Sequence, residues 1–180
     1  NFENNQKAAY TLNNNEICYN NFKDNKNGLI LKNNNKIYSN TFSDNDIAVD
    51  SRNNNQIYSN TFENNKHAVV SEVKNRIYSN VFSDNFFGNN NEISFNNFSN
   101  NDNSLFLNNK NNILNNTFKN NKIGVVLNDN NVVSFNGFYN NSLALKGLKS
   151  NKIKNNSFSN NENSVQLAGS SNELSNNSFS

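Results

Sequence analysis

The stretch Asn35-Lys36-Ile37-Tyr38-Ser39-Asn40-Thr41-Phe42 recurs almost unchanged at 55–62 and 75–82. A looser form of this stretch extends through the whole chain. Phenylalanine returns in steps of 20 residues, with one step of 16 and one of 21, at Phe2, Phe22, Phe42, Phe62, Phe82, Phe98, Phe118, Phe138, Phe158 and Phe179. Self-similarity at a fixed period of this length indicates a repeat architecture.

Other residue types keep a fixed distance from each phenylalanine. From Phe22 onward, a branched aliphatic residue stands five positions earlier, and asparagine stands two positions before and three positions after that aliphatic residue. A third asparagine series, from Asn5 to Asn161, follows the first nine phenylalanines by three residues. Asparagine supplies 55 of the 180 residues, a composition typical of disordered segments. The fixed apolar phases argue against disorder, because a disordered tract has no reason to keep them.

Composition and charge exclude several classes of protein. The net charge is +2 and no basic run is present, so the sequence shows no footprint for nucleic acid or an anionic membrane. No apolar run approaches the roughly 20 residues of a membrane span. A single cysteine, Cys18, excludes an internal disulfide framework. The chain lacks an initiator methionine, so we expect residues 1–180 to be one repeat domain from a longer repetitive protein.

The spacing within each unit predicts an all-β fold. Apolar residues two apart, such as Leu29 and Leu31, lie on one side of a strand, and no stretch has the 3.6-residue period of a helix. Asn, Asp, Ser and Gly separate these stretches and favour turns. We therefore predict a parallel β-solenoid of about nine coils, each of about 20 residues and three short strands. Ile and Phe should form inward columns, and three asparagine columns should form amide ladders at the turns.

The pattern Asn-x-Ile-x-x-Asn-x-Phe-x-x-Asn-x-x-Gly/Ala-Val-x-Leu resembles the parallel β-helix repeat of pectate-lyase-like proteins. It is most similar to the short coils of the NosD-like, carbohydrate-binding-and-sugar-hydrolysis group, and Asn-rich arrays of this kind resemble surface adhesin-like proteins of archaea and bacteria. The resemblance covers essentially the whole chain and implies a right-handed helix. It implies little about function, because the family includes enzymes, binding proteins and passive stalks.

Two coils depart from the repeat, and one of them has only an extra residue near Ala168–Ser171, which we interpret as a longer turn. The other is shorter. Ile93 follows Phe82 by eleven residues instead of fifteen. We expect this coil to lack its Val/Leu strand, with Phe87-Gly88 in the place of Ile47-Ala48 and one face pinched. The result could be a notch that serves as a site, formed by Phe86, Phe87, Gly88, Asn89 and Asn90. The alternative is a tolerated deletion that Phe86 and Phe87 fill.

Carboxylates could support acid/base chemistry or calcium binding. Asp24 and Asp44 fall at equivalent turn positions, with Asp46 nearby and Asp84 two coils further on. Other coils carry asparagine at that position, so we interpret these aspartates as turn residues and predict no catalytic residue. If the chain were an enzyme, it would be a polysaccharide lyase or hydrolase that uses Asp24, Asp44 and Asp46, and we keep this function as the second alternative to a structural role.

An outward aromatic column is the candidate binding surface. Tyr38, Tyr58 and Tyr78 each follow an inward isoleucine, so they should point outward and stack on successive coils. Such a strip could bind sugar rings, or it could serve only to stabilise the sheet. Cys18 occupies the same outward column, and we expect it to be a free thiol.

Charged residues and the single histidine suggest no cofactor site. Lys26, Asp46 and Lys66 form an outward column of alternating sign, and Glu16 lies beside Lys36. We interpret these as surface pairs of small energetic value. His67 is interpreted as a solvated turn residue. The chain has no Met, one His and one Cys, so the copper site associated with NosD-like proteins cannot be transferred, and no metal or cofactor is predicted.

The repeat favours a structural role, because the coils are alike and the loops are minimal. We expect a rigid stalk or filament segment at the cell surface or outside the cell, in contact end to end with flanking repeats or with other copies. A carbohydrate-binding module on the tyrosine face is the alternative. Five Asn-x-Ser/Thr sequons could accept glycans, at Asn97, Asn115, Asn140, Asn155 and Asn176.

Overall fold

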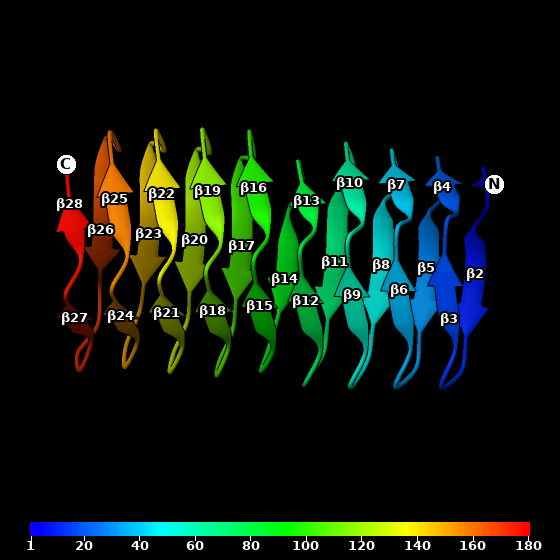
Figure 1. Cartoon of the computed structure of the whole chain (residues 1–180), viewed down its shortest axis with the longest axis horizontal. Helices are drawn as coiled ribbons and strands as arrows, with labels where there is room; N and C mark the ends of the chain where they lie inside the picture. Colours follow the sequence, from blue (N-terminus) through cyan, green and yellow to red (C-terminus); the bar gives the residue numbers. More distant parts are fainter.

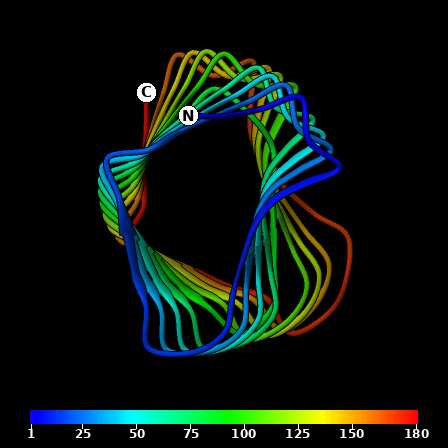
Figure 2. The same ribbon diagram turned by 90° about the vertical axis from the view of Figure 1, so that its right-hand side faces the viewer.

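The computed structural model describes residues 1–180 and shows a parallel β-solenoid of nine coils with no helix. Successive coils stack along one axis, and the two termini lie at opposite ends (Figure 1). Seen from the N-terminal end, the chain turns clockwise as it recedes from the viewer (Figure 2). The helix is therefore right-handed, and the predicted fold is confirmed.

Each coil contributes one strand to each of three parallel sheets. Sheet A contains β1 (Phe2–Glu3), β4 (Asn21–Lys23), β7 (Thr41–Ser43), β10 (Thr61–Glu63), β13 (Val81–Phe82), β16 (Asn97–Ser99), β19 (Thr117–Lys119), β22 (Gly137–Tyr139), β25 (Ser157–Ser159) and β28 (Ser178–Phe179). Sheet B contains β2 (Lys7–Thr11), β5 (Asn27–Leu31), β8 (Ile47–Ser51), β11 (His67–Ser71), β14 (Phe86–Gly88), β17 (Asn103–Leu107), β20 (Ile123–Leu127), β23 (Leu143–Gly147) and β26 (Asn163–Leu167). Sheet C contains β3 (Glu16–Cys18), β6 (Lys36–Tyr38), β9 (Gln56–Tyr58), β12 (Arg76–Tyr78), β15 (Glu92–Ser94), β18 (Asn112–Leu114), β21 (Val132–Ser134), β24 (Lys152–Lys154) and β27 (Glu173–Ser175).

Identical residues stack because the strands pair in register. Phe22 pairs with Phe42, and Ile37 pairs with Ile57. The phenylalanine rings form one stack from Phe2 to Phe179, with neighbouring ring centroids 4.7–5.0 Å apart and nearly parallel planes. The isoleucine column and the aliphatic residues of sheet B complete a single buried core. The predicted inward columns are confirmed.

Each regular corner consists of a residue with positive φ followed by a ladder asparagine. At the corner before β9, Asn54 has a φ of 57° and Asn55 is buried. The Oδ1 of Asn55 accepts hydrogen bonds from the backbone N–H and the Nδ2 of Asn35, at 2.8 and 3.2 Å. The Nδ2 of Asn55 donates to the carbonyl of Lys32 at 2.8 Å. One amide thus joins neighbouring coils through several bonds, and the predicted ladders are confirmed.

The short coil keeps all three strands, so the prediction of a missing strand is wrong. Phe86 pairs with Val69 and with Leu105, and Gly88 pairs with Ser71. Phe87-Gly88 therefore does not take the place of Ile47-Ala48. The four-residue deletion shortens the turns of this coil and the start of its sheet B strand, which has three residues instead of five. Phe86 is fully buried and fills the interior of this coil.

The same coil changes one asparagine ladder. Counting residues assigns the ladder position to Asn85, but the structure places Asp84 there. The backbone N–H and the Nδ2 of Asn65 donate to the two carboxylate oxygens of Asp84 at 2.9 and 2.7 Å. Asp84 also lacks the positive φ found at Asp24 and Asp44, because it occupies the ladder position and not the turn position. The deletion removes the positive-φ turn residue that precedes the ladder residue in the regular coils. The turn interpretation holds for Asp24 and Asp44 and is wrong for Asp84.

We expect Asn116→Asp to lower the free energy of unfolding by about 2–4 kcal/mol. Asn116 is buried, and its Nδ2 lies within hydrogen-bond distance of the carbonyls of Ile93 and Leu114. A carboxylate cannot donate these bonds and would place a charge in the wall of the core. Urea unfolding measures the loss.

Asn115→Asp is the matched control, because it adds the same charge one residue away. Asn115 is exposed and has a φ of 54°, a conformation that aspartate also adopts at Asp24. A similar loss for both variants would contradict the assignment of the stability to the ladder.

Candidate functional site

The predicted tyrosine column forms as expected on the outer face of sheet C. The ring centroids of Tyr38 and Tyr58 lie 5.1 Å apart, those of Tyr58 and Tyr78 lie 5.0 Å apart, and the planes are within 11° of parallel. Tyr19 packs edge-on against Tyr38, and the guanidinium of Arg76 lies over the Tyr78 ring at 5.6 Å. The ring faces are therefore turned toward one another or covered at the two ends, and ring edges face solvent.

Polar contacts fix the tyrosine column further. The hydroxyl of Tyr78 lies 3.4 Å from the Oε1 of Gln56. A hydrogen bond and an electrostatic interaction with the Cys18 side chain raise the pKa of Tyr38 to about 12. Cys18 is a free thiol at the end of the column, as predicted. These contacts stabilise protonated, stacked phenols, an arrangement that suits packing better than sugar binding through ring faces.

The notch residues Phe86, Phe87, Gly88, Asn89 and Asn90 lie in the short coil. Phe86 and Gly88 are buried, while the other three are half-buried. The Phe87 ring packs edge-on against His67, with centroids 5.0 Å apart, and is tilted against Phe106. None of the surface hollows of the molecule is lined by these residues. The aromatic side chains occupy the space that a notch would need.

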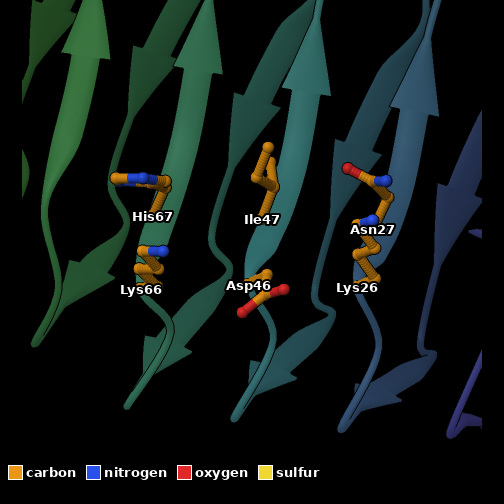
Figure 3. Close-up of a pocket in the computed structure, with 6 residues that line it drawn as sticks. All are labelled: Lys26, Asn27, Asp46, Ile47, Lys66 and His67. Carbon is orange, nitrogen blue, oxygen red and sulfur yellow. The ribbon is translucent and has the colours of Figure 1, made fainter. Parts of the chain in front are cut away.

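A shallow hollow opens instead at the start of three neighbouring sheet B strands (Figure 3). Its volume is about 260 Å³, and it is lined by Lys26, Asn27, Asp46, Ile47, Lys66 and His67. The column of alternating charge borders it, but no salt bridge joins Asp46 to either lysine. Glu16 and Lys36 do pair, at 3.0 Å. The sequence contained the charged column but no signal for a hollow.

His67 forms one wall of this hollow and is not a solvated turn residue. It begins β11 and is half-buried, and its Nδ1 is buried without a hydrogen-bond partner. Burial lowers the pKa of His67, and the charge of Lys66 acts in the same direction. The sequence placed His67 in the turn, whereas the structure makes it the first residue of β11.

The predicted carboxylates do not gather around the hollow. Asp24 and Asp44 occupy the positive-φ turn column, where Asp24 pairs with Lys23 at 3.5 Å, and only Asp46 lines the hollow. No group of three or more His, Cys, Asp or Glu side chains is arranged to hold a metal ion. One carboxylate between two ammonium groups can contact a small polar molecule, but it has no second acid or base beside it.

Asp84 is the one ionisable group inside the wall of the core. Burial raises the pKa of Asp84 to about 6, although the hydrogen bonds from Asn65 act in the opposite direction. On the far side of Asp84, the Oδ1 of Asn101 is buried and has no hydrogen-bond partner. In the regular coils this atom accepts bonds from the preceding ladder asparagine. The ladder is therefore interrupted between Asp84 and Asn101.

Comparisons with protein-family models, curated proteins and solved structures gave no match. The structure contains no helix that could cross a membrane. The β-solenoid fold thus rests on the geometry described above, and the resemblance to a particular family stays a prediction.

We expect the unfolding free energy of the protein to respond to the charge of Asp84. An ordinary aspartate has a pKa of about 3.9, so between roughly pH 4 and 6 the folded state holds a proton that the unfolded state releases. The contribution of Asp84 to stability therefore falls as pH rises through this window. Asp84→Asn should remove that dependence and raise stability at pH 7 by about 1–3 kcal/mol.

Urea unfolding of both proteins at several pH values checks this expectation. Asp24→Asn is the control, because Asp24 lies in an exposed turn. A constant difference between Asp84→Asn and the parent protein from pH 4 to pH 7 would contradict the assignment.

We expect Tyr58→Ala to lower the free energy of unfolding by about 1–3 kcal/mol, because it removes two ring stacks. Tyr10→Ala is the control, since Tyr10 is exposed and stacks on no other ring. A glycan array separates this role from sugar binding. Capture of the parent protein that is lost in a folded Tyr58→Ala variant would support a binding column instead.

Proposed function

We propose that this chain is a rigid structural segment, a stalk or filament unit of a protein at the cell surface or outside the cell. The observation that carries the proposal is the unbroken phenylalanine stack from the first coil to the last. The stack and the asparagine ladders couple each coil to its neighbours, so bending at any coil would separate rings and break hydrogen bonds. Nearly identical coils with short turns suit a spacer better than a catalytic site.

The proposal includes kinship with the pectate-lyase-like, NosD-like repeats and with adhesin-like surface proteins. The repeated motif supports this kinship, because its isoleucine, phenylalanine and asparagine positions fill the roles that the resemblance implies. Enzymatic activity is not part of the proposal. The support for a passive role is the position of Asp24 and Asp44 in the turns and the isolation of Asp46.

We also propose that the end coils contact further coils. The Oδ1 atoms of the first ladder residues receive no hydrogen bond, and these residues are Asn5, Asn15 and Asn20. At the other end, the backbone N–H groups of the last ladder residues donate to no ladder asparagine. These last residues are Asn161, Asn172 and Asn177. The two ends are complementary, so flanking repeats or a second copy could continue the ladders head to tail.

Rigidity can be tested by measuring distances between spin labels along one column. Lys7 and Asn163 occupy equivalent positions in the first and last coils. The double variant Lys7→Cys, Asn163→Cys is made in a Cys18→Ser background, and a spin label is attached to each new cysteine. Pulsed electron resonance should give one narrow distance of about 38 Å between the two labels, because eight strand spacings separate them. A label pair at Lys7 and Asn103 should give about 24 Å, from five spacings.

The two label pairs control for each other, because only the number of coils between the labels differs. A broad distance distribution, or a distance that does not scale with the number of coils, would overturn the rod. Low concentration keeps separate molecules from contributing to the signal.

A further inference from the structure

Three bulky aromatic residues occupy a strained turn position at the corner between sheets C and A. Tyr19, Phe95 and Phe135 have φ values of 57°, 56° and 58°. Large side chains rarely adopt this conformation, which costs them about 1–2 kcal/mol. Their exposed fractions are 80%, 60% and 56%. Neither the core nor the turn requires these residues, since serine or asparagine fills the same position in the other coils.

The aromatic residues of this corner follow a reciprocal pattern. Where the last residue of the sheet C strand is Tyr38, Tyr58 or Tyr78, the turn residue after it is serine. Where the turn residue is aromatic, the strand residue before it is small, as at Ser94 and Ser134, which are buried. In these coils, one of two adjacent sequence positions at this corner thus carries the large side chain, and Tyr19 packs against Tyr38 of the next coil. This corner stripe extends over seven successive coils and comprises Tyr19, Tyr38, Tyr58, Tyr78, Phe95, Leu114 and Phe135.

The stripe lies beside the corner at which the strands of sheet A begin. In the view down the axis, the strands of sheet A spread out from almost one point at the corner just below the C label, while the other corners drift from coil to coil (Figure 2). The outward column next to the stripe on sheet A carries no charge over these coils, and it comprises Asn21, Thr41, Thr61, Val81, Asn97, Thr117 and Gly137. On its other side, on sheet C, the stripe is bordered by two ion pairs, Lys36 with Glu16 and Arg76 with Glu92. The result is a long aromatic surface with one uncharged border and one border of paired charges.

We infer that a second copy of this chain packs side by side along the corner stripe. A large aromatic side chain buries roughly 150–250 Å². At their exposed fractions, Tyr19, Phe95 and Phe135 together offer about 400 Å² per copy. Two copies and the half-buried members of the stripe bring the buried area past the roughly 1,000 Å² of a specific interface.

A second copy fits the surface better than an unrelated partner. A two-fold contact brings the same patch of both chains together, so aromatic residues meet aromatic residues along the whole line. The uncharged column on sheet A and the pairing of opposite charges on sheet C limit like-charge repulsion between identical chains. The corner beside the stripe stays almost in line along the axis (Figure 2), so two rods can touch over several coils without wrapping around each other. Lateral pairing does not depend on the stalk proposal, since it requires only the folded chain.

Sedimentation equilibrium of the 180-residue chain, with small-angle scattering on the same samples, tests the inference. We expect a reversible dimer whose maximum dimension stays close to that of the monomer while its cross-section grows. A monomer at every concentration would overturn the inference and leave the stalk proposal intact. A dimer of doubled length would overturn it too, because that shape indicates end-to-end stacking.

The triple variant Tyr19→Ser, Phe95→Ser, Phe135→Ser identifies the surface. Serine already occupies this turn position at Ser39, Ser59 and Ser79, so the variant should fold and resist heat at least as well as the parent. We expect its dimer dissociation constant to rise roughly tenfold or more, because central aromatic anchors carry most of the energy of an interface.

The matched control is Tyr10→Ser, Phe106→Ser, which removes two exposed aromatic residues from sheet B. Its dimer dissociation constant should stay unchanged. Equal weakening in both variants, or none in the folded triple variant, would show that the corner stripe is not the contact.

Discussion

The structure depends on the hydrogen bonding of buried asparagine side chains. Each ladder amide must lie in the wall of the core, where an unmade hydrogen bond costs about 1–3 kcal/mol. The Oδ1 of Asn55 accepts from Asn35 in the preceding coil, and the backbone N–H of Asn55 donates to the Oδ1 of Asn75 in the following coil. A single coil could not satisfy its own asparagines. The ladders therefore make stacking a condition of folding, and they impose the parallel register that places phenylalanine on phenylalanine.

The corners explain why the chain is rich in asparagine without being disordered. The ladder position needs a side chain with one acceptor and two donors, while the residue before it needs a positive φ. Asparagine satisfies both requirements better than other residues. The positive-φ position is the more tolerant of the two, since it also holds Lys74, Ser39 and Phe95. Sequence variation on this surface is thus concentrated where it leaves the ladders intact.

The coil number, the strands and the inward columns could be predicted from sequence because the ladder asparagines, Ile37 and Phe42 each have one structural role and a fixed spacing. The short coil could not be predicted, because a deletion can be absorbed in several turns. Counting from Phe82 selected Asn85, whereas packing selected Asp84 for the ladder and Phe86 for the core. The hollow beside His67 depends on side-chain positions across three coils. The stacking of Tyr58 was predictable from its column, but the coverage of its ring faces was not.

The interruption between Asp84 and Asn101 makes one boundary between neighbouring coils different from the others. Two asparagine ladders and the phenylalanine stack cross this point, but the third ladder does not. Four regular coils lie on each side of the short one. In a protein whose units interact only with their neighbours, the weakest boundary separates cooperative units. This boundary is held by one column of side-chain hydrogen bonds fewer than the boundaries between regular coils.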